Sequence, residues 1–586
     1  MNFNSLSRRD VLALGLLAAV PLDLLADFAG AAPAANSSAM RTLDRFIAGY
    51  CAAMNAPGLT LGLANAEGTL RVASYGYVDL AAKAPVTPSH LFEIGSISKS
   101  FVGLILLQLH EEQKVDLQAP IRGYLPWLSM ETSFGEILVH HLLTHSSGMP
   151  DDAPLIPASP ERRPRQALKP GSEFHYSNWG YDVLGRLIET VDGRPWPAAV
   201  TARILKPVGM TDTSPTITSA SRARIAQSYM PLHDDRPFPR HGALVPAGNL
   251  AVEFAAGSIA STPKDMSLYM QMLMNHGEIR GGRIISEDSF KLFSTPHIAA
   301  PPFGPAAGYG YGIAVDKLDG HVRLRHTGGM VSFMSAIHMD LDAKIGAFAS
   351  INAQLGYRPN PVAQLALQLL RSEREHGKPP AIPAFDAAAK VESAESYNAV
   401  YSSGTRRLEV KNVGDRLNLI VDGRTIPLQQ SEDGGFIADQ AGFDLFPITF
   451  ERANGSPAEP GDKSTTPAAA EQSKAPIIAM SYGPDWYARA GYTGQAALEP
   501  SAALAKYVGE YYSENPWSGT VRVVQRQRRL WMGGTDPLIP IGDHLFRIGA
   551  EPTSPGVAEF SALIGDRPSF LWIDGVQFRR IEETAV

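Results

Sequence analysis

Residues 95–101 read GSISKSF and set a serine, Ser96, three positions before a lysine, Lys99. The spacing by itself is weak evidence, because at average residue usage it occurs about once by chance in a chain of this length. The chain holds such a coincidence in residues 261–264, STPK. There Pro263 suits the first position of a helix, and the hydroxyl before it suits an N-cap. The surroundings of each pair must therefore decide what it does.

Ser96 stands just before FVGLILLQL, a run that is apolar on every side of a helix. Such a helix is buried, so we expect Ser96 at the N-terminus of an interior helix, where N–H groups and the helix dipole favour developing negative charge. Lys99 lies one turn further along on the same face. Partial desolvation would lower its pKa, as a general base for a serine hydroxyl requires. The pair is therefore a candidate nucleophile with its base.

Two further stretches carry polar side chains next to predicted elements. Tyr176 and Asn178 come just before an amphipathic helix, in residues 170–189, PGSEFHYSNWGYDVLGRLIE. A predicted strand ends in residues 325–330, RHTGGM, which contain His326, Thr327, Gly328 and Gly329. Glycines at a strand end let the backbone approach a ligand closely.

The pairs Ser96–Lys99, Tyr176–Asn178 and His326–Gly328, in this order, resemble the three active-site motifs of the serine β-lactamase and penicillin-binding-protein superfamily. The tyrosine form of the second motif is similar to that of class C β-lactamases, D-stereospecific aminopeptidases and related esterases. The connecting segments of that branch are similar to residues 142–150 (LLTHSSGMP), 206–215 (KPVGMTDTSP) and 258–266 (SIASTPKDM).

The resemblance implies a reaction through an acyl-enzyme on Ser96. Lys99 and the Tyr176 phenol would take the serine proton and return it to the leaving group. Backbone N–H groups of Ser96 and Gly329 would form the oxyanion hole, and Asn178 would bind the substrate amide and Lys99. The third motif, with His326, Thr327, Gly328 and Gly329, would complete the substrate site. No metal or organic cofactor is implied.

The third motif departs from the family pattern in its first residue. In β-lactamases and transpeptidases this residue is usually lysine, whose fixed charge helps to bind a substrate carboxylate, and here it is His326. Histidine is mostly neutral at pH 7 when unperturbed. The departure favours esters, amides or D-amino-acid peptides over penicillins and D-Ala-D-Ala termini. Histidine is familiar at this place in esterase and aminopeptidase relatives, so catalysis is still expected.

Periodicity predicts an α+β domain over residues 38–380, with strands at its two ends and an inserted helical part between them. The resemblance implies a β-lactamase-like antiparallel sheet flanked by helices. Helical spacing is present at 41–54, 101–112, 181–191, 264–275 and 361–371. Strand-like runs are present at 59–65, 70–77, 310–315, 322–326, 333–340 and 345–351.

Two similar all-β modules are predicted after this domain, at residues 390–494 and 500–586. YNAVYSS at 397 aligns with YVGEYYS at 507, and RLNL at 416 aligns with RLWM at 529. We expect two antiparallel barrel-like modules that resemble the lipocalin-like barrels of some D-aminopeptidase and esterase relatives, with a structural or substrate-restricting role. Residues 454–476 have almost no large apolar groups and predict a disordered loop.

The first 31 residues resemble a twin-arginine export signal, with SRRDVL at 7–12 before a moderately apolar run. Pro21 and Asp23 interrupt that run, which favours cleavage over the alternative of an uncleaved anchor. A periplasmic or secreted protein without a stable membrane anchor is therefore expected. The single cysteine, Cys51, excludes an internal disulfide and a cysteine-based metal site. The net charge of −7 disfavours nucleic acid as a partner.

Our first hypothesis is thus an exported serine hydrolase that acts through acyl-Ser96 on small esters, amides or D-amino-acid peptides. Within the same chemistry, β-lactamase or D-Ala-D-Ala carboxypeptidase activity is the alternative. A catalytically silent relative that binds peptidoglycan or peptide fragments is the alternative from another class. The sequence leaves the acyl and leaving groups and the oligomeric state open.

Overall fold

The computed structural model describes residues 37–157, 163–233, 235–237, 242–248, 250–354, 359–383, 391–431, 435–453, 475–494, 498–515 and 517–581. The predicted signal peptide over residues 1–31 lies outside these residues, as does all but the last two positions of the predicted loop 454–476. Within the described part of the chain, no helix is both long and apolar enough to cross a membrane.

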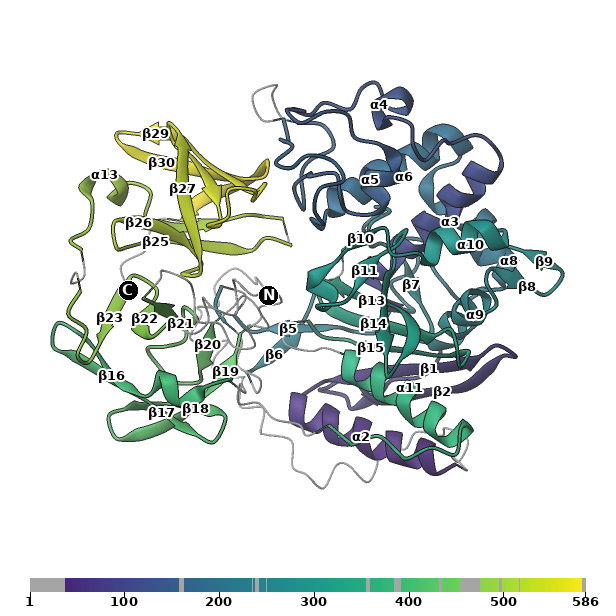
Figure 1. Cartoon of the computed structure of the whole chain (residues 1–586), viewed down its shortest axis with the longest axis horizontal. Coiled ribbons are helices and arrows are strands. Elements are labelled where there is room, and N and C mark those ends of the chain that lie inside the picture. The colour runs from purple at the N-terminus through teal and green to yellow at the C-terminus, as the bar shows by residue number, and fades with distance from the viewer. Residues whose placement is uncertain are drawn as a thin grey trace, which may run out of the picture.

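A nine-stranded antiparallel sheet forms the centre of the N-terminal domain (Figure 1). Its strands are β1 (Gly58–Asn65), β2 (Thr69–Asp79), β3 (Ala84–Pro85), β10 (Ile298–Ala299), β11 (Gly308–Tyr309), β12 (Ala314–Leu318), β13 (His321–Met330), β14 (Phe333–Asp340) and β15 (Ile345–Ile351). They lie in the order β10-β11-β12-β13-β14-β15-β1-β2-β3. The two ends of the domain meet where β1 pairs with β15, with Leu61 opposite Ala349. The predicted antiparallel sheet, built from both ends of the domain, is confirmed.

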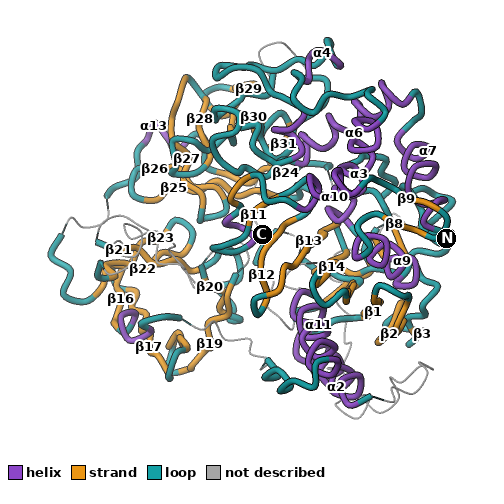
Figure 2. The backbone as a smooth tube through the Cα atoms, turned by 45° about the vertical axis from the view of Figure 1, so that its right-hand side comes forward, coloured by secondary structure: helices purple, strands orange, loops and turns teal. Residues whose placement is uncertain are grey.

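Helices pack against this sheet in layers (Figures 1 and 2). α2 (Ser38–Met54) and α11 (Asn360–Arg374) pack against each other, and α11 contacts β14 and β15. α9 (Pro263–Met274) contacts β1, where a Cβ added to Gly62 would sit 2.4 Å from the Pro263 carbonyl oxygen. Glycine is therefore required on β1 for this close approach.

The predicted helical insertion lies between two short strands, β4 (Phe92–Glu93) and β7 (Ala260–Ser261), which pair with each other. All side chains from Ile97 to Leu107 are buried, so the interior helix after Ser96 is as the apolar run predicts. The helices of the insertion are α3 (Ser98–Glu111), α4 (Ile121–Tyr124), α5 (Val139–Leu143), α6 (Asn178–Asp192), α7 (Trp196–Val200) and α8 (Lys206–Val208), with a π turn at Thr201–Leu205. The remaining elements of the domain are α10 (Glu287–Ser294), a 3₁₀ turn at Pro301–Phe303, and the strand pairs β5 (Tyr229–Pro231) with β6 (Leu244–Pro246) and β8 (Glu278–Ile279) with β9 (Gly282–Arg283).

The single strand predicted over residues 310–315 is wrong. The chain instead turns between β11 and β12, with Gly312 at φ +85°. A Cβ added to Gly312 would sit 2.3 Å from the Lys99 carbonyl oxygen. The contact with the start of α3 thus outweighs the strand propensity of residues 310–315. A local sequence pattern cannot predict such a long-range contact.

Two closed eight-stranded antiparallel barrels follow, which confirms the predicted pair of barrel-like modules. The first holds β16 (Ala399–Ser403), β17 (Arg406–Val413), β18 (Arg416–Val421), β19 (Arg424–Gln430), β20 (Phe436–Ala438), β21 (Ile448–Arg452), β22 (Ile477–Tyr482) and β23 (Asp485–Arg489), preceded by a 3₁₀ turn at Ala394–Tyr397. The second holds β24 (Gly509–Tyr512), β25 (Thr520–Arg526), β26 (Arg529–Met532), β27 (Asp536–Gly542), β28 (Leu545–Ile548), β29 (Val557–Ile564), β30 (Arg567–Ile573) and β31 (Val576–Ile581), preceded by α13 (Ala502–Ala505). The repeated RL motif falls on the third strand of each barrel, β18 and β26.

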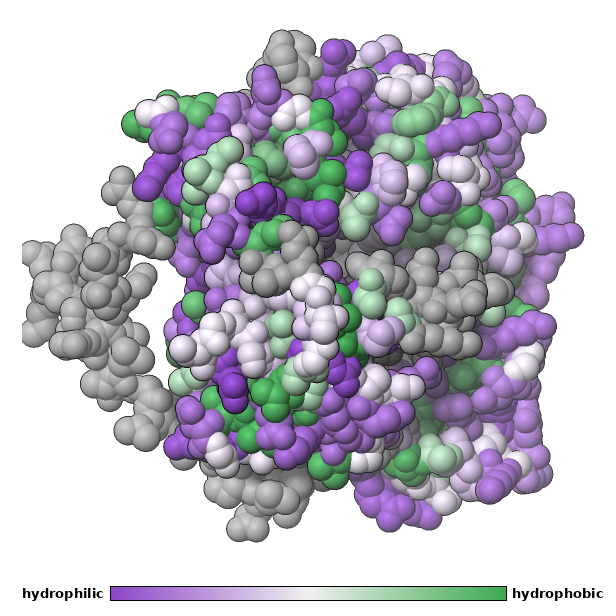
Figure 3. All heavy atoms as spheres, turned by 60° about the vertical axis from the view of Figure 1, so that its left-hand side comes forward, coloured by the Kyte–Doolittle hydropathy of each residue, from purple (hydrophilic) through white to green (hydrophobic). Residues whose placement is uncertain are grey.

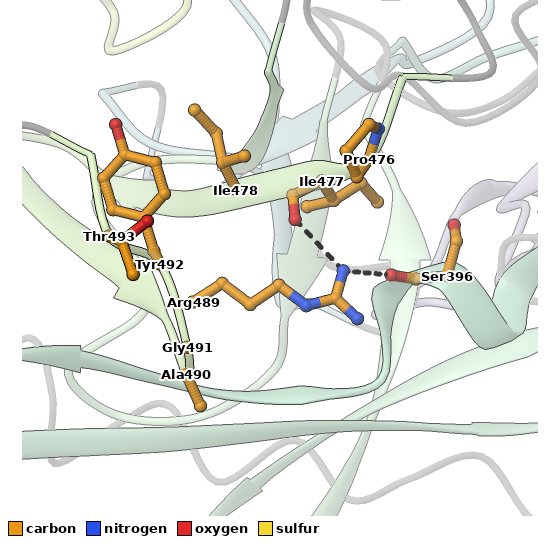
Figure 4. Close-up of a pocket in the computed structure, with 9 residues that line it drawn as sticks. All are labelled: Ser396, Pro476, Ile477, Ile478, Arg489, Ala490, Gly491, Tyr492 and Thr493. Carbon is orange, nitrogen blue, oxygen red and sulfur yellow. Dashed lines mark hydrogen bonds between the residues drawn. The ribbon is translucent and has the colours of Figure 1, made fainter.

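An arginine on the last strand closes each barrel in the same way. Arg489 of the first barrel donates to the carbonyl oxygens of Ser396 at 2.6 Å and Ile477 at 3.0 Å, beside a pocket of about 440 Å³ (Figure 4). Arg580 of the second donates to the Lys506 carbonyl at 2.9 Å. Because both barrels hold the arginine in equivalent contacts, we assign Arg489 to barrel closure rather than to ligand binding.

The segment between β5 and β6 joins the N-terminal domain to both barrels. Arg236 pairs with Asp444 of the first barrel at 2.7 Å, and Asp235 pairs with Arg522 of the second. The face of the molecule that carries the barrels has hydrophilic and hydrophobic residues interspersed (Figure 3). The second barrel also reaches the helical insertion, since a Cβ added to Gly575 would sit 2.8 Å from a Pro154 side-chain carbon.

Candidate active site

Ser96 lies in a single 3₁₀ turn, η2 (Gly95–Ile97), directly before α3. Gly95 takes φ +53°, and a Cβ there would sit 2.8 Å from the Gly329 nitrogen. Glycine is required at this position by both the backbone conformation and the lack of space. The turn therefore places Ser96 beside the end of β13, and the first and third predicted motifs meet.

Lys99 lies in the first turn of α3 and is fully buried. Its Nζ donates to Ser96 Oγ at 2.9 Å, to Asn178 Oδ1 at 2.6 Å and to the Ala256 carbonyl at 2.9 Å. Burial lowers the pKa of Lys99 to about 8, although nearby carboxylates, first that of Asp182, oppose the shift. A substantial fraction of this lysine is therefore neutral slightly above pH 7.

The three partners of Lys99 can hold both its charged and its neutral form. A carbonyl oxygen and an amide oxygen can only accept, so they take the two N–H bonds of the amine. When Lys99 is charged, Nζ donates to Ser96 Oγ as well. When Lys99 is neutral, Ser96 Oγ, which can donate as well as accept, can turn its hydrogen to the nitrogen lone pair. The arrangement thus positions Lys99 to take the serine proton.

Tyr176 comes two residues before α6 and also reaches Ser96. Its phenol shares a hydrogen bond with the Ser96 side chain, and Lys99 Nζ lies 4.9 Å from the centre of its ring. Burial raises the pKa of Tyr176 above its ordinary range, and the contact with Ser96 opposes that shift. Tyr176 therefore keeps its proton at neutral pH and can serve as a proton donor.

His145, in the segment LLTHSSGMP, packs against Tyr176. The two rings stack with centres 4.2 Å apart, and the Ser177 N–H donates to His145 Nδ1 at 3.0 Å. Burial holds the pKa of His145 well below its usual range, and the charge of Lys99 adds to the shift. His145 is thus a neutral ring that fixes the second motif in place.

Asn178 begins α6, and Ser177 caps the helix by accepting the Gly180 N–H at 2.9 Å. Asn178 Oδ1 accepts from Lys99, and its Nδ2 donates to Asp151 Oδ1 at 3.0 Å. The amide is therefore held between an amine and a carboxylate. This arrangement joins the first and second motifs.

His326 is buried and faces aromatic residues. Its Nε2 lies 2.9 Å from the Tyr309 hydroxyl, and its ring centre lies 5.3 Å from that of Phe303. Burial lowers the pKa of His326 to about 3. The first residue of the third motif thus carries no charge at neutral pH. Of the other predicted residues of this motif, Thr327 is half-buried, Gly328 is buried and Gly329 is exposed beside Gly95.

Carboxylates that the sequence analysis missed surround this site. Asp151 and Asp152 follow the LLTHSSGMP segment, and Asp574 comes from the turn between β30 and β31 of the second barrel. Burial, together with the charges of Asp151 and Asp152, raises the pKa of Asp574 to about 7. The second barrel therefore adds negative charge close to the predicted motifs.

The second barrel approaches from another direction as well. Trp517, between β24 and β25, packs edge-on against Phe254 with ring centres 6.0 Å apart. Phe254 lies two residues before Ala256, whose carbonyl accepts from Lys99. Two loops of the barrel thus border the residues around Ser96.

One group of possible metal ligands is present in the described part of the chain, His321 with Asp340 and Asp342. Asp340 already pairs with Arg371 at 2.9 Å and accepts the Ala343 N–H at 2.8 Å. The group lies at the start of β13, whereas the predicted motif lies at its end. Nothing about it suggests a role in the chemistry of Ser96.

Comparisons with known proteins agree with this geometry. The Beta-lactamase family model matches residues 43–370. An uncharacterized protein of Mycobacterium tuberculosis is 27% identical over 294 residues, which cover 42% of this chain and 72% of that protein. Protein flp of Staphylococcus aureus is 28% identical over 314 residues, 51% of this chain and 60% of flp. Among solved structures, the octameric penicillin-binding protein homologue from Pyrococcus abyssi matches with a TM-score of 0.53 and 27% identity, over 69% of this chain and 94% of that one.

The family model covers more than half of the chain and contains all three predicted motifs. The sheet order, the helical insertion and the meeting of Ser96, Lys99, Tyr176 and Asn178 are the structural counterpart of that match. The chain therefore belongs to the β-lactamase family of serine hydrolases, with two β-barrels appended.

Proposed function

We propose that this chain is an exported hydrolase that forms an acyl-Ser96 intermediate on small neutral or cationic esters, amides or peptides, D-amino-acid peptides included. The contacts of Lys99 carry the proposal, because Nζ lies 2.9 Å from Ser96 Oγ and has two further acceptors, Asn178 Oδ1 and the Ala256 carbonyl. A neutral amine that gives its two N–H bonds to these two acceptors has its lone pair free for the Ser96 hydroxyl. Export to the periplasm or medium rests on the pattern of residues 1–31.

The reaction begins when Ser96 Oγ attacks the substrate carbonyl carbon and its proton passes to Lys99 Nζ. The carbonyl electrons move to oxygen, and the N–H groups of Ser96 and Gly329 stabilise the oxyanion. When the carbonyl re-forms, the bond to the leaving group breaks and the leaving group takes the proton of the Tyr176 phenol beside Ser96. The proton that Lys99 received then passes to the phenolate, so that both groups regain their starting protonation. Water then attacks the acyl-enzyme by the same route and releases the acid.

The charges around Ser96 support the choice of substrate class. A neutral His326 cannot attract a carboxylate as a lysine would, and Asp151, Asp152 and Asp574 repel one when they are ionised, which for Asp574 requires a pH above about 7. An ammonium group on the substrate would instead be attracted. Neutral and cationic substrates are therefore favoured over penicillins and peptides with a free carboxylate near the scissile bond.

Activity should rise with pH and reach half its maximum at about pH 8, which we call the acid limb of the profile. The reason is that only neutral Lys99 accepts the serine proton and its pKa is lowered to about 8. Measuring kcat/KM for a small neutral ester across this range checks the prediction. A limb near the ordinary lysine pKa of about 10.4 would contradict a buried, desolvated base.

Replacing Asp574 by asparagine should shift selectivity toward anionic substrates. The variant keeps the acceptor for the Val557 N–H, which lies 2.8 Å from Oδ1, but removes the charge. We expect the ratio of kcat/KM for a carboxylate-bearing ester to that for its neutral analogue to rise about fivefold at low salt. Asp566→Asn, at the exposed turn between β29 and β30 of the same barrel, should leave the ratio unchanged. If this ratio is unchanged in D574N too, Asp574 of the second barrel does not take part in substrate selection.

A serine-directed fluorophosphonate tests the proposal as a whole. A single adduct, mapped by mass spectrometry to Ser96, is expected, and turnover of esters, amides and D-amino-acid amides should follow. Rapid hydrolysis of a chromogenic cephalosporin would favour the β-lactamase or carboxypeptidase alternative. A folded protein that takes no adduct would instead favour the silent peptidoglycan- or peptide-binding relative.

A further inference from the structure

Asp182 is a half-buried carboxylate that the proposed mechanism does not use. It lies on α6 one turn after Asn178, so the two side chains share a face of the helix. Burial raises the pKa of Asp182 to about 7, and the charge of Lys99 opposes that shift. No ion pair holds its carboxylate within the part of the chain that the structure describes.

Asp182 reaches Lys99 through one peptide unit. Its Oδ1 accepts the Ala256 N–H at 3.1 Å, and the Ala256 carbonyl accepts from Lys99 Nζ at 2.9 Å. The segment around Ala256 packs directly against α6, since a Cβ added to Gly185 would sit 2.5 Å from the Ala255 Cβ. The carboxylate, the peptide and the amine are thus aligned by packing.

We infer that Asp182 is a positioning residue for the Ser96–Lys99 pair: it holds the Ala256 carbonyl on Lys99, and its charge sets the pH range in which Lys99 accepts a proton. The inference rests on the proposed function. A residue needed only to fix the Ala256 turn could be any acceptor of the right length, whereas setting the pH range requires the carboxylate.

The other ionisable groups around Lys99 act in known directions. They are Asp151 and Asp152 from the segment after α5, Tyr176 before α6, His145 after α5, and His326 on β13. The carboxylates favour the charged form of Lys99, as Asp182 does, and the neutral rings do not. Three carboxylates oppose the lowering of the Lys99 pKa, and Asp182 has the largest effect among them.

The test compares Asp182→Asn with wild type by the rate at which the fluorophosphonate labels Ser96 between about pH 5 and pH 10. Asparagine keeps an oxygen for the Ala256 N–H and removes the charge. Without that charge the ammonium form of Lys99 is less favoured, so its pKa falls. The acid limb of the labelling rate should therefore move down by about one pH unit.

Asp265→Asn is the control, because Asp265 is a buried carboxylate that also accepts a backbone N–H, that of Asp212 at 2.8 Å. The acid limb of Ser96 labelling in D265N should lie at the same pH as in wild type. A D182N limb that stays with wild type would overturn the inference, and so would equal shifts in D182N and D265N. Asp182→Ser is a second variant without the charge, and we expect the same downward shift of its acid limb. The absence of that shift would also overturn the inference. Failure of wild type to label at all would instead defeat the proposed function.

Discussion

Ser96→Ala should lower turnover of every substrate by about 10⁴-fold or more while leaving the fold intact. The alanine removes the atom that forms the acyl bond, and no neighbouring side chain can replace it. Tyr176 keeps its proton at neutral pH, because burial raises its pKa, and Lys99 is still held by the Asn178 amide oxygen and the Ala256 carbonyl. Steady-state kinetics and thermal unfolding of the two proteins check the prediction.

The chain supplies its own control in the second serine–lysine spacing. Ser261 lies on β7 and exchanges a hydrogen bond with the Thr213 hydroxyl at 2.8 Å, away from Lys99. Ser261→Ala should cost about 1 kcal/mol of stability, as the loss of one buried hydrogen bond does, and leave kcat/KM unchanged. Retained turnover in S96A, or equal losses in both variants, would contradict an acyl-Ser96 intermediate.

The elements with strong periodicity could be predicted from the sequence, because their contacts repeat along the chain. Apolar residues on α2 recur with the helical period. The strands β14 and β15 are buried at every position. The turn at Gly312 could not be predicted, because its cause is contact with the Lys99 backbone more than two hundred residues earlier. Local pattern reports local contacts only.

The same distinction separates the parts of the site. Ser96 and Lys99 could be identified because a helical turn joins them, and the other motifs because they match a known family. Asp574 comes from a different domain, and only folding places it near Asp151. Asp182 offered one unused signal, its position one turn after Asn178 on a helix whose first turn carries a motif. A carboxylate one helical turn after a motif residue is therefore a candidate to act on the same site.

Lys99→Met should lower the rate of Ser96 labelling and kcat/KM by about 10³-fold, within the range that a general base contributes. Methionine fills nearly the same volume as the lysine stem, so the effect measures the lost amine rather than a cavity. The pH limb near pH 8 should disappear with it, because the group that titrates there has been removed. Lys264→Met, at the exposed lysine of the second spacing, should change neither the rate nor the limb.

A small primary amine separates loss of the base from loss of structure. Lys99→Ala leaves a cavity where the buried side chain lay, so added propylamine should restore part of the labelling rate in K99A. The same amine should do nothing in K99M, where the methionine occupies that space. Rescue in neither variant, with both folded, would indicate that Lys99 maintains the geometry of Ser96 without accepting its proton. Rescue confined to K99A requires a nitrogen base at this one position, which a purely structural lysine does not explain.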